Sequence, residues 1–392
     1  MAQFEVERQE MITRRRLITL AATVFLASCK VIPKGEAPAP PPPPPPPSAD
    51  ILPTDVARHR VALLVPLTGA NAAAGQSIAN AATMALLDTN AQNLRVTNYD
   101  TAAGAAAAVN KAIADKNTLI LGPLLSEDIP AIAGSAKRAN VPVISFSNDE
   151  TAATGGVYIM GNIPGQSVDR VVNYARGKGI NAFGALVPLG EYGRRASDAL
   201  MASVRAGGGQ VVAMENYDRS NTSVAAAAAK LHERSGFQAV LIADGGTMSG
   251  RAASSLKAPG SRGAVQLLGT ELWSGEKVVT TTPALQGAWF AAVADDRFGQ
   301  FSNSYRNRFG ATPFRIATLG YDGVLLALRI AREWTPGTQF PAARLFDRGG
   351  FLGLDGVFRF QRSGVIERAL EVREIHANGV RVISPAPTRF DD

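Results

Sequence analysis

The sequence predicts an α/β protein with two lobes, each a parallel β-sheet flanked by helices. Short apolar runs that end at Pro or Gly alternate with segments of helical period, as buried parallel strands and their crossover helices do. This alternation pauses near residue 160 and then restarts, so the chain contains two such units. Aromatic residues make up only 7% of the chain and Ala and Gly are abundant, which suits close packing of helices on sheets.

The first unit alternates four strands with three helices. Its opening strand, residues 61–65, is uniformly apolar and ends at Pro66, as expected for a strand buried on both faces. A helix over residues 74–88 follows, with its apolar residues on one side. The remaining elements are a strand at 94–99, a helix at 103–114, a strand at 118–121, a helix at 126–140 and a strand at 141–146.

The second unit follows a short apolar stretch at residues 157–160. We expect its helices at 166–177, 192–206, 223–234 and 248–256, and its strands at 183–187, 210–213, 239–243 and 265–268. Residues 321–328 carry the apolar stripe of one more helix. Near the end the period changes to two, and residues 357–360 and 371–375 are expected to form a late β-hairpin.

The first 28 residues have the features of an export leader. Arg14, Arg15 and Arg16 form a basic start, and the apolar stretch at 17–26 is too short to cross a bilayer of about 30 Å. The basic start also resembles a twin-arginine signal, and Met11 is a possible true start because a complete leader follows it. A chain with such a leader is expected in the periplasm.

Cys29 closes this leader and is the only cysteine of the chain, so no internal disulfide can form. The string at 26–29 (LASC) resembles the lipobox of bacterial lipoproteins, which implies that Cys29 is lipidated and tethers the protein to a membrane. By the same resemblance, Lys30 favours the inner leaflet of the outer membrane. Residues 29–57 then form a linker whose proline run at 38–47 favours polyproline II, a semi-rigid spacer of about 30 Å.

No catalytic constellation or metal site emerges from the sequence. The three histidines lie far apart without ligand spacing, and we find no phosphate-binding glycine loop and no nucleophile elbow. We therefore expect neither an enzyme nor a cofactor. The net charge of +7 is scattered along the chain, which indicates a solvated surface and no nucleic-acid partner.

Candidate ligand-binding side chains lie where predicted strands end, because open α/β sheets bind ligands there. Ser126 begins a predicted helix, so it could hold an anion or act as a plain helix cap. The acids among the candidates could meet a cation or simply be solvated. The candidates are Ser126, Ser147, Asn148 and Asp149 in the first unit and Tyr192, Asp244 and Glu271 in the second.

The predicted strands and the loops that follow them, in their order along the chain, resemble the type I periplasmic-binding fold of the Leu/Ile/Val-binding-protein-like group. The resemblance covers about residues 58–390. The resemblance rests on residues 61–69 (VALLVPLTG), 122–126 (GPLLS) and 141–145 (VPVIS). It implies three crossings between lobes, near Gly161, Ala292 and Leu345. The first lobe would then comprise residues 58–161 and 293–345, and the second lobe residues 162–292 and 346–390.

A closer resemblance is to the penicillin-binding protein activator branch, the LppC/YraM-like lipoproteins of the outer membrane. It is carried by residues 142–148 (PVISFSN), 190–193 (GEYG), 268–273 (LGTELW) and 350–360 (GFLGLDGVFRF). It implies a partner, a bifunctional peptidoglycan synthase that the protein stimulates across the periplasm. Better-known enterobacterial activators carry a helical domain before this fold, where the present sequence has the proline-rich linker.

The alternative is a substrate-binding lipoprotein that delivers amino acids or related small molecules to an ABC permease. Amino-acid binders use a hydroxyl residue to hold the ligand carboxylate, and Asp149 falls at about that position. A fixed negative charge there would repel the carboxylate, which favours the activator. A hydrolase has no supporting triad.

Overall fold

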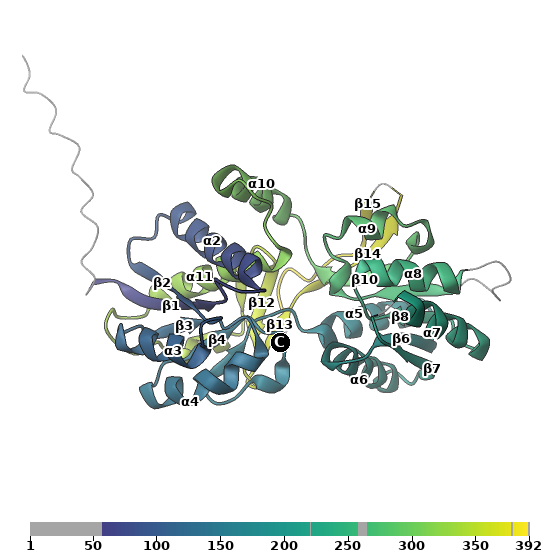
Figure 1. Cartoon of the computed structure of the whole chain (residues 1–392), viewed down its shortest axis with the longest axis horizontal. Helices are drawn as coiled ribbons and strands as arrows, with labels where there is room; N and C mark the ends of the chain where they lie inside the picture. The colour runs from purple at the N-terminus through teal and green to yellow at the C-terminus, as the bar shows by residue number, and fades with distance from the viewer. Residues whose placement is uncertain (1–56, 220, 258–264, 378, 391–392) are drawn as a thin grey trace, which may run out of the picture. The chain divides into compact units, whose positions relative to one another are not determined.

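The computed structural model describes residues 57–219, 221–257, 265–377 and 379–390. The leader, Cys29 and the proline spacer lie outside these residues. Within them the chain builds two large sheets, each covered by helices, and one small sheet (Figure 1). The predicted two-lobed α/β fold class is confirmed.

The first lobe contains a five-stranded parallel sheet in the order β2-β1-β3-β4-β5. Its strands are β1 His59–Val65, β2 Leu94–Asp100, β3 Leu119–Leu121, β4 Val143–Ser145 and β5 Val157–Ile159. The helices α2 Ala72–Asp88 and α11 Thr318–Ala331 pack together, as do α3 Ala105–Ala114 and α4 Ile129–Ala139. Helix α4 begins three residues later than predicted, because Pro130 occupies its first turn and a 3-10 turn precedes it.

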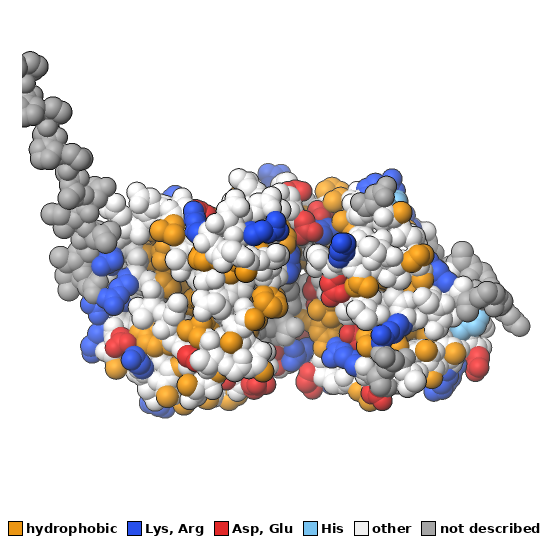
Figure 2. Space-filling model, turned by 45° about the horizontal axis from the view of Figure 1, so that its top comes forward, with side chains coloured by type: hydrophobic (Ala, Val, Ile, Leu, Met, Phe, Trp, Pro, Cys, Tyr) orange, Lys and Arg blue, Asp and Glu red, His pale blue; other side chains and the backbone are white. Residues whose placement is uncertain are grey.

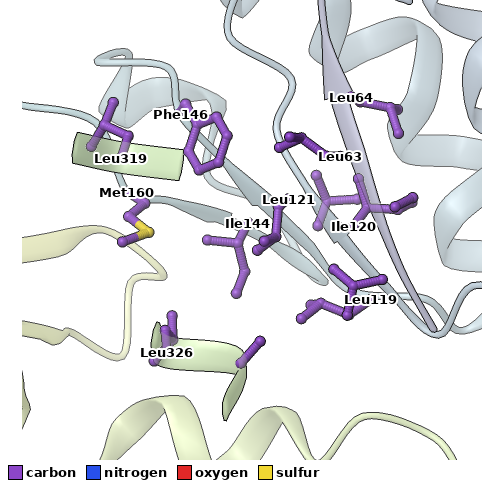
Figure 3. Packing of buried hydrophobic residues seen from close by; sticks show 14 of the residues in the cluster. Leu63, Leu64, Leu119, Ile120, Leu121, Ile144, Phe146, Met160, Leu319 and Leu326 are labelled. Carbon is purple, nitrogen blue, oxygen red and sulfur yellow. The ribbon is translucent and has the colours of Figure 1, made fainter. Parts of the chain in front are cut away.

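The core of the first lobe is a layer of branched apolar side chains between its sheet and its helices. Figure 3 shows Leu121 of β3 beside Ile144 of β4, with which it pairs in the sheet. Leu63 of β1, Phe146 just after β4 and Leu326 of α11 belong to the same cluster. Each of these side chains is at most 2% exposed, and burying one is worth roughly 1.5–3 kcal/mol. This core fixes the ends of the strands, from which the polar loops emerge.

The second lobe contains a seven-stranded mixed sheet in the order β15-β14-β10-β9-β8-β6-β7. The strands from β7 to β10 run parallel, and β14 and β15 pair antiparallel at one edge. The strands are β6 Ala182–Pro188, β7 Gln210–Tyr217, β8 Ala239–Ile242, β9 Gln266–Gly269, β10 Trp289–Val293, β14 Leu370–His376 and β15 Gly379–Ser384. Helix α5 Pro164–Gly177 packs on α6 Glu191–Ala206, and α7 Asn221–Arg234 packs on α8 Gly246–Leu256.

The small sheet corrects the predicted late hairpin. Its strands β11 Phe351–Gly353, β12 Gly356–Phe360 and β13 Ile366–Arg368 pair with one another, whereas β14 joins the large sheet of the second lobe. Phe351, Phe358 and Ile366 belong to the core of the first lobe. The chain therefore enters the second lobe near Ala369, and not near Leu345 as the resemblance implied.

Three short segments connect the lobes and form the hinge. They follow β5 at Gly161–Ile163, β10 at Asp295 and β13 at Ala369, in the described part of the chain. Gln166 of α5 reaches across, since its side-chain amide donates to the carbonyl oxygen of Ile366 at 2.5 Å and accepts from the Arg368 N–H at 3.1 Å. Helix α5 of the second lobe is thus bonded to β13, the last strand of the small sheet.

Candidate functional site

The loop after β4 holds three of the predicted ligand-binding residues. Ser147 is buried, and its hydroxyl accepts the backbone N–H of Asp149 at 3.0 Å. Asp149 Oδ1 accepts the N–H of Thr151 at 3.0 Å and its hydroxyl at 2.6 Å, which caps a short 3-10 helix. These side chains therefore stabilise their own loop.

The other oxygen of Asp149 is bound by the second lobe. Arg195 of α6 lies with Nη2 2.7 Å from Asp149 Oδ2 and donates from Nη1 to Asn148 Oδ1 at 3.4 Å. The Arg195 and Asp149 side chains are only 11% and 16% exposed. This interlobe ion pair joins the loop after β4 in the first lobe to α6 in the second lobe.

Tyr192 and Glu271, predicted on separate loops, are brought together in the second lobe. The Tyr192 hydroxyl donates to Glu271 Oε1 at 3.0 Å and lies 2.8 Å from Thr270 Oγ1. Ser167 of α5 donates to Glu271 Oε2. Burial raises the pKa of the Glu271 carboxyl, and burial together with the Glu271 charge raises the pKa of the Tyr192 phenol. Both carboxyl oxygens of Glu271 thus have partners within the lobe.

Asp244 follows β8 and is buried within the second lobe. Its carboxylate accepts from Tyr217 at 3.0 Å, from Arg219 Nε at 3.1 Å and from the N–H of Gly245 at 2.8 Å. The Trp273 indole donates to its carbonyl oxygen at 2.9 Å. Asp244 therefore holds the loop before α8 in place.

Ser126 lies in the 3-10 turn before α4, and its side chain does not cap that turn. No hydrogen bond between described residues joins it to the other six candidates. The structure therefore brings Asn148 and Asp149 to α6 and joins Tyr192 to Glu271. Asp244 has no hydrogen bond to either side chain of this second pair, but its charge acts on Tyr192.

Sequence analysis missed Arg195 and Ser167, because their partners lie far away along the chain. Neither residue carries a local signal of its partner, since Arg195 lies beyond the first turn of α6 and Ser167 lies within α5.

The remaining surface agrees with the scattered charge of the sequence. On the face in Figure 2, Lys and Arg lie interspersed with Asp and Glu. No helix among the described residues combines the length and the apolar composition that crossing a membrane requires. In the described part of the chain, no group of three or more His, Cys, Asp or Glu side chains is placed so that it could hold a metal ion.

Comparison with known proteins decides the family. A family model described as periplasmic binding protein matches residues 59–377. The chain belongs to the periplasmic binding protein family. Its fold and family are those of binding proteins that work outside the cytoplasm. A curated relative, an uncharacterised protein of Rickettsia prowazekii, is 31% identical over 142 residues, which span 36% of this chain and 38% of that protein.

Solved structures of two functional kinds share this binding-protein fold. One is a putative branched-chain amino acid ABC transporter protein from Rhodospirillum rubrum, with 21% identity, a TM-score of 0.74, and coverage of 83% of this chain and 100% of that one. Another is the C-domain of LpoA (YraM) from Haemophilus influenzae, a regulator of PBP1A, with 15% identity, a TM-score of 0.63, and coverage of 83% and 99%. At these identities the similarity establishes the fold and leaves the role open.

Proposed function

We propose that this protein is a non-enzymatic lipoprotein of the periplasm that activates a peptidoglycan synthase. The observation that carries the proposal is the ion pair between Asp149 and Arg195. In a solute-binding protein the ligand joins the lobes. The lobes close around the ligand, and a permease recognises this closed form. Here two side chains of the protein itself join the lobes at that position.

The polar groups expected to hold a ligand support the same proposal. Both carboxyl oxygens of Glu271 and both of Asp149 already have protein partners. An amino acid would have to displace these contacts and place its carboxylate beside Asp149, which costs binding free energy. The LpoA C-domain, described as a regulator of PBP1A, has this fold, so the fold is compatible with regulation.

The proposed lipid anchor would determine where the binding fold lies in the periplasm. A lipid on Cys29, a residue outside the described part, would hold the binding fold on the outer membrane, and the linker at 29–57 would extend it toward the cell wall. A synthase that works on the wall could then be contacted from that side. No chemical step is asked of the protein, and docking alone would shift the synthase toward its active state.

The alternative, a substrate-binding lipoprotein of an ABC importer, is favoured by one observation. The Tyr192–Glu271 pair presents a carboxyl and a phenol at the ends of strands, as a site for a ligand ammonium group would. The similarity to the Rhodospirillum protein fits this alternative equally. Its partner would be a permease.

Calorimetric titration and affinity capture distinguish a synthase activator from a substrate-binding protein of an importer. The full-length chain in detergent is titrated with the protein amino acids and with muropeptides, and is also used to capture partners from envelope extracts. We expect no micromolar amino-acid isotherm, and we expect a peptidoglycan synthase among the captured proteins. A micromolar isotherm with an amino acid, or capture of a permease without a synthase, would contradict the proposal.

A further inference from the structure

Arg368, at the end of β13, is a guanidinium buried in the hinge without a paired carboxylate. The residue is 5% exposed, and its Nη2 donates to the carbonyl oxygen of Met160 at 2.8 Å. Its Nε and Nη1 have no hydrogen-bond partner among the described residues. By contrast, the neighbouring Arg315 and Arg373 each form ion pairs with buried or half-buried carboxylates.

A small cavity lies against this guanidinium. It is lined by residues in or close to the three hinge segments, Asn162, Val293 and Arg368, and by Arg315, Ser167 and Glu271 from the two lobes. It offers about 30 Å³ to the centres of water-sized molecules, two to three times the roughly 10–15 Å³ that one water needs. The Asn162 side-chain oxygen and Arg315 Nε also lack partners among the described residues.

The charges around the cavity leave Arg368 undercompensated. Asp355 and Asp322 act on it only at longer range, and no described carboxylate forms an ion pair with it. Burial raises the pKa of Asp322 to about 7, so near neutral pH this acid supplies only part of a negative charge. Glu271 also lines the cavity, and both of its carboxyl oxygens are already bonded, to Ser167 and to Tyr192. Arg368 bonds to the Met160 carbonyl oxygen and lies over the Phe358 ring, with Cζ 5.4 Å from the ring centroid, but it has no paired carboxylate. A buried charge that lacks an opposite charge is destabilising.

We propose that this hinge cavity binds a small carboxylate ion, of formate or acetate size, against Arg368. One carboxylate oxygen accepts from the guanidinium, and the hydroxyls of Ser167 and Ser274 line the space around the other. The cavity is too large for one water and has polar groups on several sides, which suits a planar ion of three or four heavy atoms. Because residues in or close to all three hinge segments line it, the bound ion would stabilise the hinge. The site is separate from the Asp149–Arg195 pair and does not depend on the partner of the protein.

The test is a titration of the full chain in detergent with sodium formate in chloride-free buffer. We expect one saturable site, also occupied by acetate and not by the larger gluconate. Arg368→Gln removes the charge and should weaken binding ten- to a hundredfold. Arg359→Gln is the matched control, since Arg359 lies on the same small sheet, pairs with Glu367 and is not part of the cavity lining. Its affinity should equal that of the wild type.

Equal affinity in Arg368→Gln, no saturable formate binding to the wild type, or tighter binding of chloride than of formate would each overturn the proposal. Circular dichroism and the thermal midpoint establish whether the variant folds. If it does not, wild-type crystals grown in formate decide the question. A planar triatomic ion against Arg368 supports the site, and ordered water at that position overturns it.

Discussion

Replacing Asp322 by Asn should change how stability depends on pH. Asp322 lies on α11, is fully buried, and accepts the N–H of Leu354 at 2.6 Å. The chain passes so close that a Cβ on Gly353 would lie 2.3 Å from an Asp322 oxygen. Burial, followed by the charge of Asp355, raises the pKa of this carboxyl from 3.8 to about 7.

The sign and size of the change in stability with pH follow from the raised pKa of Asp322. The folded protein holds the Asp322 proton more tightly than the unfolded chain, so the stabilisation is complete below pH 3.8 and is lost as pH rises to about 7. A shift of about 3 pH units corresponds to about 4 kcal/mol. The Asn variant cannot ionise at this position, and its side-chain oxygen can still accept from Leu354. The stability of the variant relative to the wild type should therefore be higher at high pH than at low pH.

The assay is urea unfolding followed by tryptophan fluorescence at pH 4.5 and pH 8. The free energy of unfolding of Asp322→Asn, relative to the wild type, should rise by about 3 kcal/mol between these two conditions. Asp198→Asn, an exposed site on α6, is the control and should track the wild type at both pH values. A difference between Asp322→Asn and the wild type that is the same at both pH values would refute the reasoning.

Three further predictions concern the lobes, the core and the anchor. Arg195→Ala breaks the interlobe pair with Asp149 and should favour separated lobes by roughly tenfold, visible as a larger radius of gyration in small-angle scattering; an unchanged radius would contradict this. Gly75→Ala places a Cβ 1.8 Å from the Pro66 carbonyl oxygen and should cost roughly 2–4 kcal/mol in thermal unfolding, whereas a neutral effect would show that the loop can move. Cys29→Ser should shift the protein from the membrane to the soluble fraction, and persistent membrane fractionation would exclude the lipid anchor.

Local pattern was enough to predict most elements of both sheets. The uniformly apolar run ending at Pro66 became the interior strand β1, and helix α6 ends at Ala206, as predicted. Period and apolar content determine such elements because they depend on residues close together in sequence. The predicted start of the helix at Ser126 was less accurate, because Pro130 divides that segment.

Pairing across long distances could not be predicted. Residues 357–360 and 371–375 both alternate with period two, but this pattern does not specify a partner, and the two strands entered different sheets. The site shows the same limit. The positions of Asp149 and Glu271 at strand ends followed from the order of elements, whereas Arg195 and Ser167, which bind them, are brought there by the tertiary fold.

The central claim is that the protein regulates a synthase rather than delivering a solute. The most direct measurement is the rate of glycan polymerisation and peptide cross-linking by the peptidoglycan synthase of its own cell, with and without an equimolar amount of the full chain. We predict that the chain increases the rate and that added amino acids do not change the increase. Equal rates with and without the chain, together with a saturable amino-acid isotherm for the chain alone, would contradict the claim.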